Sequence, residues 1–145
     1  MNPLEAIRVK LLRNGAKMPV RSTALASGFD VFACIDGPVE VGQHPVVIPT
    51  GVAMEVPAGL DAQFRPRSGL ARQGVLCTFG TLDADYRGEI MITMYTVAPD
   101  IRYTVQPGDR ISQLVVTRLA PGDFGVGKEL SRTARGAGGH GSTGR

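Results

Sequence analysis

Short alternations of apolar and polar residues recur along most of the chain and predict a fold built from β-strands. Residues 7–12 show the pattern, because apolar side chains occupy every second position, as in a strand with one buried face. Glycine and proline residues interrupt the alternation at short intervals, which is typical of turns. Strands are predicted over residues 7–12, 28–33, 39–41, 46–48, 51–56, 62–65, 75–77, 90–95, 101–105 and 110–116. This pattern predicts an all-β sandwich or barrel.

Two segments depart from the strand pattern. Residues 67–74 have room for one helical turn, which we expect Ser68 to cap and Gly74 to end. Residues 122–134 form a polar connector, and the glycine-rich residues 135–145 lack the apolar side chains of a core. We expect this tail to be flexible unless a ligand orders it. The predicted division is therefore a β-barrel domain over residues 1–121 and a C-terminal arm over residues 122–145.

The composition fits a single soluble domain that binds an anion. The 145 residues include 19 glycines and 10 prolines, and the formal net charge is +3. This mild positive charge suits an anionic small molecule at least as well as a nucleic acid. Cys34 and Cys77 have neither the spacing nor the histidine partners of a metal site, so we expect both in the core. The sequence shows no signal peptide and no membrane span, which predicts a soluble, cytoplasmic protein.

Candidate chemistry is concentrated in residues 80–90, between two apolar runs. A β-hairpin with Asp83, Asp85 and Tyr86 at its tip is the natural interpretation. The two carboxylates could hold Mg²⁺ or divide into a base and a bystander, although aspartate is also common in turns for local reasons. The ring of Tyr86 could enter the core, or it could stack on a base or a sugar.

Several other residues have the chemistry of phosphate ligands. Arg67, Ser68 and Gly69 offer a guanidinium, a hydroxyl and free amides at a helix start, although an ordinary helix cap would look the same. Gln113 is a polar residue within a predicted core strand, which suggests a ligand or a buried hydrogen bond. In a regular strand Arg110 and Gln113 point to opposite faces, so only one of them need face a site.

The C-terminal tail is the third candidate anion site. Residues 136–143 resemble a P-loop, but Ser142 replaces its lysine, and no strand precedes and no helix follows in the expected pattern, so we reject that motif. Glycine amides, Arg135 and the hydroxyls of Ser142 and Thr143 could still bind an anion, or the tail could simply be a solubilising end. Together the three regions supply phosphate donors, acids and an aromatic ring, which indicates a nucleoside polyphosphate site.

Five stretches, taken in order, resemble the five motifs of the homotrimeric dUTPases. They are residues 26–31, 66–71, 80–88, 107–114 and 135–144, and the resemblance extends over nearly the whole chain. It implies a jelly-roll-like, distorted β-barrel with a short helix, assembled as a trimer with sites shared between subunits. It also implies hydrolysis of dUTP to dUMP and pyrophosphate with Mg²⁺, which keeps uracil out of DNA and supplies dUMP for thymidylate synthesis.

The resemblance also implies roles for individual residues. Asp83 would activate the water that attacks the α-phosphorus, Tyr86 would pack on the deoxyribose, and Asp30 would touch the Mg²⁺ shell through water. The backbone around Cys77, Thr81, Leu82 and Met91 would recognise uracil. Phosphate ligands from a second chain would be Arg67, Ser68, Gly69 and Gln113. The phosphate-binding lid, contributed by a third chain, would use Arg135, His140, Gly141, Ser142 and Thr143.

Two positions depart from the family pattern. His140 stands where the family usually has phenylalanine, so we expect a weaker lid that depends on pH. Thr96 stands where asparagine is frequent, and the sequence gives no reason for it.

Two other functions are the alternatives. A dCTP deaminase has a similar arginine-serine stretch, but its catalytic glutamate would fall at Thr93, which cannot act as the base. A non-catalytic jelly-roll protein could use the basic tail on nucleic acid. Intact Asp83, Arg67 and Arg135 favour an enzyme, so no stable nucleic-acid binding is expected.

Overall fold

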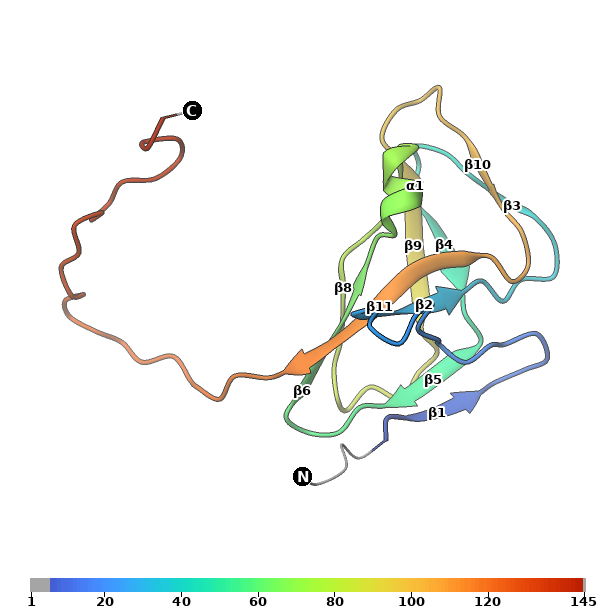
Figure 1. Cartoon of the computed structure of the whole chain (residues 1–145), viewed down its shortest axis with the longest axis horizontal. Helices are drawn as coiled ribbons and strands as arrows, with labels where there is room; N and C mark the ends of the chain where they lie inside the picture. The colour runs from blue at the N-terminus through green and yellow to red at the C-terminus, as the bar shows by residue number, and fades with distance from the viewer. Residues whose placement is uncertain (1–5, 145) are drawn as a thin grey trace.

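The computed structural model describes residues 6–144 and contains, within that range, eleven β-strands and one short α-helix (Figure 1). The helix is α1 (Ser68–Arg72). The strands are β1 (Arg8–Leu11), β2 (Gly28–Phe32), β3 (Val39–Val41), β4 (Val46–Pro49), β5 (Val52–Glu55), β6 (Leu60–Arg65), β7 (Val75–Cys77), β8 (Gly80–Leu82), β9 (Met91–Thr96), β10 (Tyr103–Val105) and β11 (Arg110–Arg118). The predicted all-β class is confirmed.

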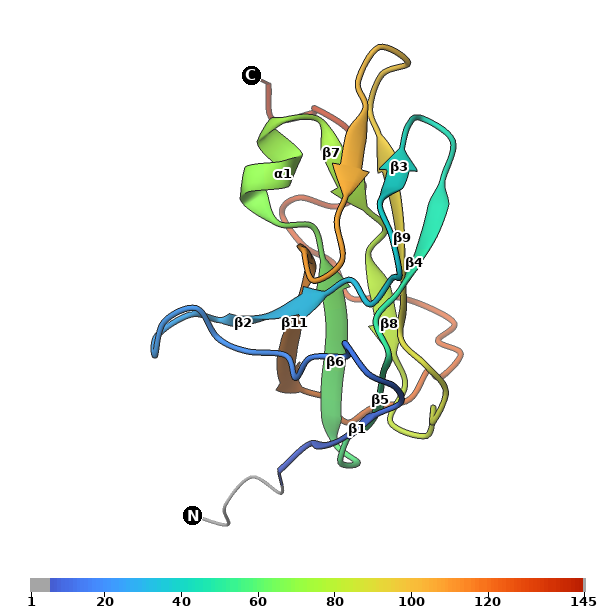
Figure 2. The same ribbon diagram turned by 90° about the vertical axis from the view of Figure 1, so that its right-hand side faces the viewer.

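The strands form a jelly-roll-like barrel from four small antiparallel sheets. Their strand orders are β1-β5, β10-β3, β2-β11-β6-β8 and β4-β9-β7. Short loops can connect antiparallel strands, whereas parallel pairs need long crossovers, and the closely spaced turns of this sequence favour the first arrangement. Figure 2 shows the sheets wrapped around one interior, with α1 at one end.

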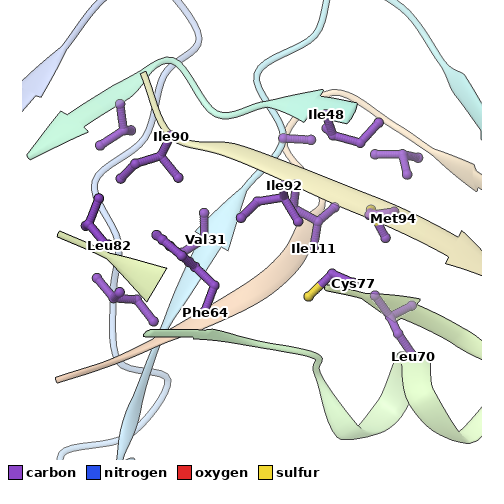
Figure 3. Close-up of a cluster of buried hydrophobic side chains, with 14 of the residues drawn as sticks. Val31, Ile48, Phe64, Leu70, Cys77, Leu82, Ile90, Ile92, Met94 and Ile111 are labelled. Atoms are coloured by element: carbon purple, nitrogen blue, oxygen red, sulfur yellow. The ribbon is translucent and has the colours of Figure 1, made fainter. Parts of the chain in front are cut away.

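The core lies between the sheets and follows from the alternation in the sequence. Along β9 the odd positions face outward or are half-buried, while Ile92, Met94 and Thr96 are buried. Figure 3 shows Ile92 beside Ile111 of another sheet, and Met94 and Phe64 belong to the same core cluster. Cys34 and Cys77 are free cysteines, and both are buried, as predicted.

The predicted hairpin of residues 75–95 is only partly correct. Its outer strands do pair, since β7 lies antiparallel to β9. After Thr78, however, the chain leaves this sheet, and Gly80–Leu82 pairs with β6 in the neighbouring one. The change of sheet places Leu82 in the core beside Phe64 (Figure 3). The acidic turn that follows therefore lies at the junction of two sheets and not at the tip of one hairpin.

The predicted helix is present, but its cap differs from the prediction. Arg67 occupies the N-cap position with extended backbone, and the helix has no side-chain cap, so Ser68 is the first helical residue. The helix therefore begins one residue earlier than a cap at Ser68 would imply. The end matches the prediction, because Gly74 has φ +82° and its N–H donates to the carbonyl of Ala71.

A β-bulge in β11 corrects the expected directions of Arg110 and Gln113. The register against β2 shifts between Arg110 and Ser112. A bulge inserts one residue and changes which face the following side chains occupy. Arg110 consequently ion-pairs with Asp30, the residue that lies opposite Gln113 in the ladder, and is not a lone surface charge.

Thr96 is explained by the loop that follows it. Its buried hydroxyl lies 3.1 Å from the carbonyl oxygen of Ala98 and 3.0 Å from that of Ile101, so it holds both ends of the β9–β10 turn.

We predict that Thr96→Val destabilises the protein by about 1–3 kcal/mol, because the buried hydroxyl no longer donates to the carbonyl oxygens of Ala98 and Ile101. Thermal unfolding should show a midpoint lower by roughly 5 °C. Thr93→Val is the matched control on the same strand, since the Thr93 hydroxyl makes no hydrogen bond among the described residues. Equal stability of the two variants would contradict this role.

Beyond β11 the chain forms an arm without strand or helix as far as residue 144 (Figure 1). Every residue from 117 to 137 is exposed. Phe124, Val126 and Leu130 are apolar and at least 90% exposed. Among residues 6–144, none of the helical structure is long and apolar enough to span a membrane.

Candidate active site

A cavity of about 260 Å³ brings together most of the residues predicted from the acidic turn. Thr81, Leu82, Asp83, Tyr86 and Met91 all line it. The remaining lining residues are Phe64, Gly80, Glu89 and Ile90. The wall is mostly apolar, with the carboxylates of Asp83 and Glu89 as its charged groups, which suits one aromatic base with an attached sugar.

Strand β8 and the turn after it determine where Asp83 lies. Leu82 is buried and fixes the strand end, so the next side chain, Asp83, emerges at the surface of the cavity. The N–H of Tyr86 donates to the carbonyl of Asp83 at 3.0 Å, which closes the turn. The Tyr86 hydroxyl donates to the carbonyl of Glu89 at 2.9 Å and holds the ring at the cavity edge. A side chain at Gly88 would collide with that ring, since a Cβ there would lie 2.4 Å from the Tyr86 oxygen.

Glu89 is a cavity residue that the sequence analysis missed. Its carboxylate accepts a hydrogen bond from the N–H of Gly51 at 2.7 Å and ion-pairs with Arg13 at 2.6 Å. The hydrogen bond to Glu89 raises the pKa of Arg13, so the guanidinium stays charged. These contacts fasten the end of the turn to the β4–β5 connection. The only sequence signal was an acid placed directly before an apolar strand.

The structure separates the two acids of the turn. Asp83 lines the cavity just described, whereas Asp85 lines a second cavity on the other side, with Arg8, Glu55 and Arg87. Within residues 6–144 no three acidic, histidine or cysteine side chains are grouped as a metal site. A metal held by Asp83 and Asp85 together therefore has no support.

Asp30 forms the centre of a charged cluster at the β2–β11 ladder. Its two carboxylate oxygens lie 3.4 Å from Arg67 Nε and 3.1 Å from Arg110 Nε. Ser22 donates a further hydrogen bond at 3.1 Å. Burial of a carboxylate such as that of Asp30 costs free energy unless partners like these compensate for the lost water. The cluster fixes the guanidinium of Arg67, one of the predicted phosphate ligands.

Other predicted phosphate ligands surround Arg67. The side chain of Gln113 donates to the carbonyl of Pro66 at 3.0 Å. Ser68 and Gly69 are exposed at the start of α1. Within residues 6–144, the cavity that contains Asp83 is not lined by Arg67, Ser68, Gly69 or Gln113.

Cys77 is buried and does not line the cavity. Its thiol lies 3.5 Å from the hydroxyl of Ser112, and burial raises its pKa, so it remains a thiol. Any contribution of this residue to uracil recognition must therefore come from its backbone.

The predicted lid residues lie in the exposed arm. Arg135 donates from Nε to the carbonyl of Gly138 at 2.8 Å, and Gly138 returns a bond from its N–H to the carbonyl of Arg135. His140, Gly141, Ser142 and Thr143 follow in further turns and are exposed. The strand–loop–helix setting of a P-loop is missing from the described tail, which agrees with the rejection of that motif.

Fold and site together define a class. The all-β barrel carries a small cavity with the exposed carboxylate of Asp83 at its edge. It also carries the arginine cluster around Asp30 and a glycine-rich arm. This combination is typical of an enzyme that hydrolyses nucleotides.

Comparison with known proteins narrows this class to one family. The dUTPase family model matches residues 14–144. The deoxyuridine 5'-triphosphate nucleotidohydrolases of Syntrophotalea carbinolica and Bdellovibrio bacteriovorus are each 43% identical to the chain. The alignments cover 95% of this chain and 96% of the first relative, and 97% of both chains for the second. The chain belongs to the dUTPase family.

Solved structures agree with the fold. The Staphylococcus bacteriophage 80alpha dUTPase with dUPNHPP superposes with a TM-score of 0.82 at 26% identity and covers 97% of this chain and 99% of that one. A variant of the dUTPase from phage phi11 of S. aureus superposes with a TM-score of 0.78 over 88% of this chain.

Proposed function

We propose that this chain hydrolyses dUTP to dUMP and pyrophosphate by attack of water on the α-phosphorus. The observation that carries the proposal is the cavity that places Asp83 beside Thr81, Leu82, Tyr86 and Met91. The reaction removes dUTP from the precursors of DNA and supplies dUMP for thymidylate synthesis.

Asp83 is the proposed catalytic residue. Its side chain is exposed at the cavity edge, where it can accept a hydrogen bond from a water and direct that water at the α-phosphorus. The proton of the water passes to the carboxylate as the new P–O bond forms, and pyrophosphate leaves with the electrons of the broken bond. The turn around Asp83 is held by backbone hydrogen bonds, which limits the cost of placing the carboxylate.

The cavity walls are the proposed selectors of base and sugar. Backbone groups near Thr81, Leu82, Met91 and Cys77 would hydrogen-bond the edge of uracil. The ring of Tyr86 would pack against the deoxyribose and leave no room for a 2′-hydroxyl, since its own hydroxyl is tied to Glu89.

We propose that the substrate phosphates are bound by Arg67, Ser68, Gly69 and Gln113. A guanidinium already oriented by Asp30 binds phosphate with less loss of side-chain entropy.

Mg²⁺ is the proposed cofactor. The described residues contain no metal cage of their own, which fits an ion held mainly by the substrate phosphates. Asp30 fits a contact through water, because its oxygens retain acceptor capacity beside two guanidiniums. The phi11 variant is described with a structural Mg(II) ion. When bound, the ion neutralises phosphate charge.

A homotrimer with shared sites is the proposed assembly. The predicted phosphate ligands and lid residues do not line the Asp83 cavity of their own chain. The exposed Phe124, Val126 and Leu130 suit an arm that packs on a neighbouring copy. Arg135, His140, Gly141, Ser142 and Thr143 would then close over a nucleotide bound elsewhere in the trimer. We further propose that the protein acts in the cytoplasm.

A substrate panel tests the proposal. With Mg²⁺ present, we expect pyrophosphate and the monophosphate from dUTP, and turnover of dTTP, dCTP and UTP lower by at least about 100-fold. Formation of dUTP from dCTP would instead support deamination, which Thr93 disfavours. No turnover together with salt-dependent binding of polynucleotides would support the non-catalytic alternative.

A further inference from the structure

Residues 83–87 form a wall shared by two cavities, because successive side chains of this turn line one or the other. Asp83 and Tyr86 face the nucleoside-sized cavity. Ala84, Asp85 and Arg87 face an open cavity of about 710 Å³ on the other side. The position of Asp83 therefore depends on what holds this wall from behind.

The side chain of Arg87 makes the contacts that hold it. Nη1 donates to the carbonyl of Ala84 at 2.6 Å and to that of Tyr86 at 3.2 Å. Nη2 lies 3.4 Å from the carboxylate of Glu55 on β5. The guanidinium thus ties two carbonyls of the Asp83 turn to a strand of a different sheet. Its planar fork of donors can satisfy all three acceptors, which a single ammonium group cannot do with the same geometry.

Glu55 is itself fixed from the opposite side. It lies opposite Arg8 in the β1–β5 ladder, and its second oxygen ion-pairs with Arg8 at 2.7 Å. The resulting chain of contacts runs from β1 through β5 to the turn that carries Asp83.

Stability alone does not explain these contacts. The side chains of Arg87, Glu55 and Arg8 are 54%, 41% and 77% exposed, and exposed ion pairs contribute little to folding. Small displacements of a catalytic group, in contrast, reduce turnover strongly.

We propose that Arg87 is a positioning residue that sets the direction of Asp83 through the backbone of residues 84–86, with Glu55 as its anchor. This inference rests on the proposed function, because Asp83 is the group that Arg87 positions.

Kinetics and hydrogen exchange test the inference together. For Arg87→Ala we expect kcat for dUTP to fall roughly 10-fold, KM to change less than about 2-fold, and the unfolding midpoint to stay unchanged. Arg87→Lys should remain impaired, whereas added ethylguanidinium should restore part of the kcat of Arg87→Ala. Glu55→Gln should lower kcat by about 3-fold, because Arg87 keeps its carbonyl contacts but loses its charged anchor.

Arg102→Ala is the matched control. Arg102 also pairs with a glutamate, Glu40, at 3.6 Å, and both side chains are exposed. It precedes β10, at the opposite end of the barrel from β1 and β5 (Figure 1). We expect its kcat to equal that of the unaltered protein.

Amide exchange separates this inference from the proposed function. Arg87→Ala should speed exchange across residues 83–88, and Arg102→Ala should not, whatever the substrate is. Unaltered protein that leaves dUTP intact would refute the proposed function alone. Normal kcat or normal exchange in Arg87→Ala, or rescue by lysine as complete as by guanidinium, would overturn the positioning role.

Discussion

Asp83→Asn is expected to lower kcat for dUTP by at least about 1000-fold while nucleotide binding persists. Asparagine has nearly the same shape, so the packing of Leu82 and the backbone bonds of the turn should survive. The amide carries no negative charge and cannot take the proton of the attacking water. Steady-state turnover and calorimetric titration with a non-hydrolysable dUTP analogue measure the two quantities separately.

Asp85→Asn provides the matched control for this prediction. It is the same chemical change two residues away on the same turn, but Asp85 faces the other cavity. We expect it to retain kcat within about 3-fold. If both variants lost turnover equally, a general charge effect of the turn would replace the specific role of Asp83. If Asp83→Asn lost nucleotide binding, Asp83 would be a structural residue.

The strands could be predicted from sequence because their signal is local. Alternating side chains report directly on the two faces of a strand, and glycine or proline marks each end. The ten predicted strands therefore match observed ones to within a few residues at each end, and among the strands of residues 6–144 only β8 (Gly80–Leu82) was not predicted as a strand.

Contacts between distant strands could not be predicted in the same way. The local pattern of residues 80–82 is compatible with a hairpin with β9 as well as with the observed pairing with β6, which places Leu82 in the core cluster that contains Phe64. The bulge in β11 likewise depends on its partner β2, so the regular-strand rule failed for Arg110 and Gln113.

The site was predictable by residue type more than by geometry. Asp83, Tyr86 and Arg67 were proposed as site residues because the chemistry of their side chains is visible in the local motifs. The ion pairs around the site join segments that are far apart in the chain, so no local sequence pattern signals them. They connect Asp30 with Arg67 and Arg110, Glu89 with Arg13, and Glu55 with Arg87.

Removal of residues 135–145 is expected to lower kcat/KM for dUTP by about 100-fold or more, because the proposed phosphate ligands Arg135, Ser142 and Thr143 are lost. The midpoint of thermal unfolding should not change, since none of residues 135–144 is buried. Arg132→Ala is the control, because Arg132 is an exposed arginine of the same arm outside the glycine-rich segment. A fully active truncation would refute the lid.

Complementation then tests whether the lid acts on another copy. We expect the truncated chain and Asp83→Asn each to have little activity alone, but each supplies the part that the other lacks. If sites are shared in a trimer, co-expression should restore about a quarter of the activity, since a random mixture combines an intact Asp83 with an intact arm at about one site in four. If each chain closed its own site, the mixture would stay inactive. The exposed Phe124, Val126 and Leu130 favour the shared arrangement, because on its own chain the arm leaves all three apolar side chains in water.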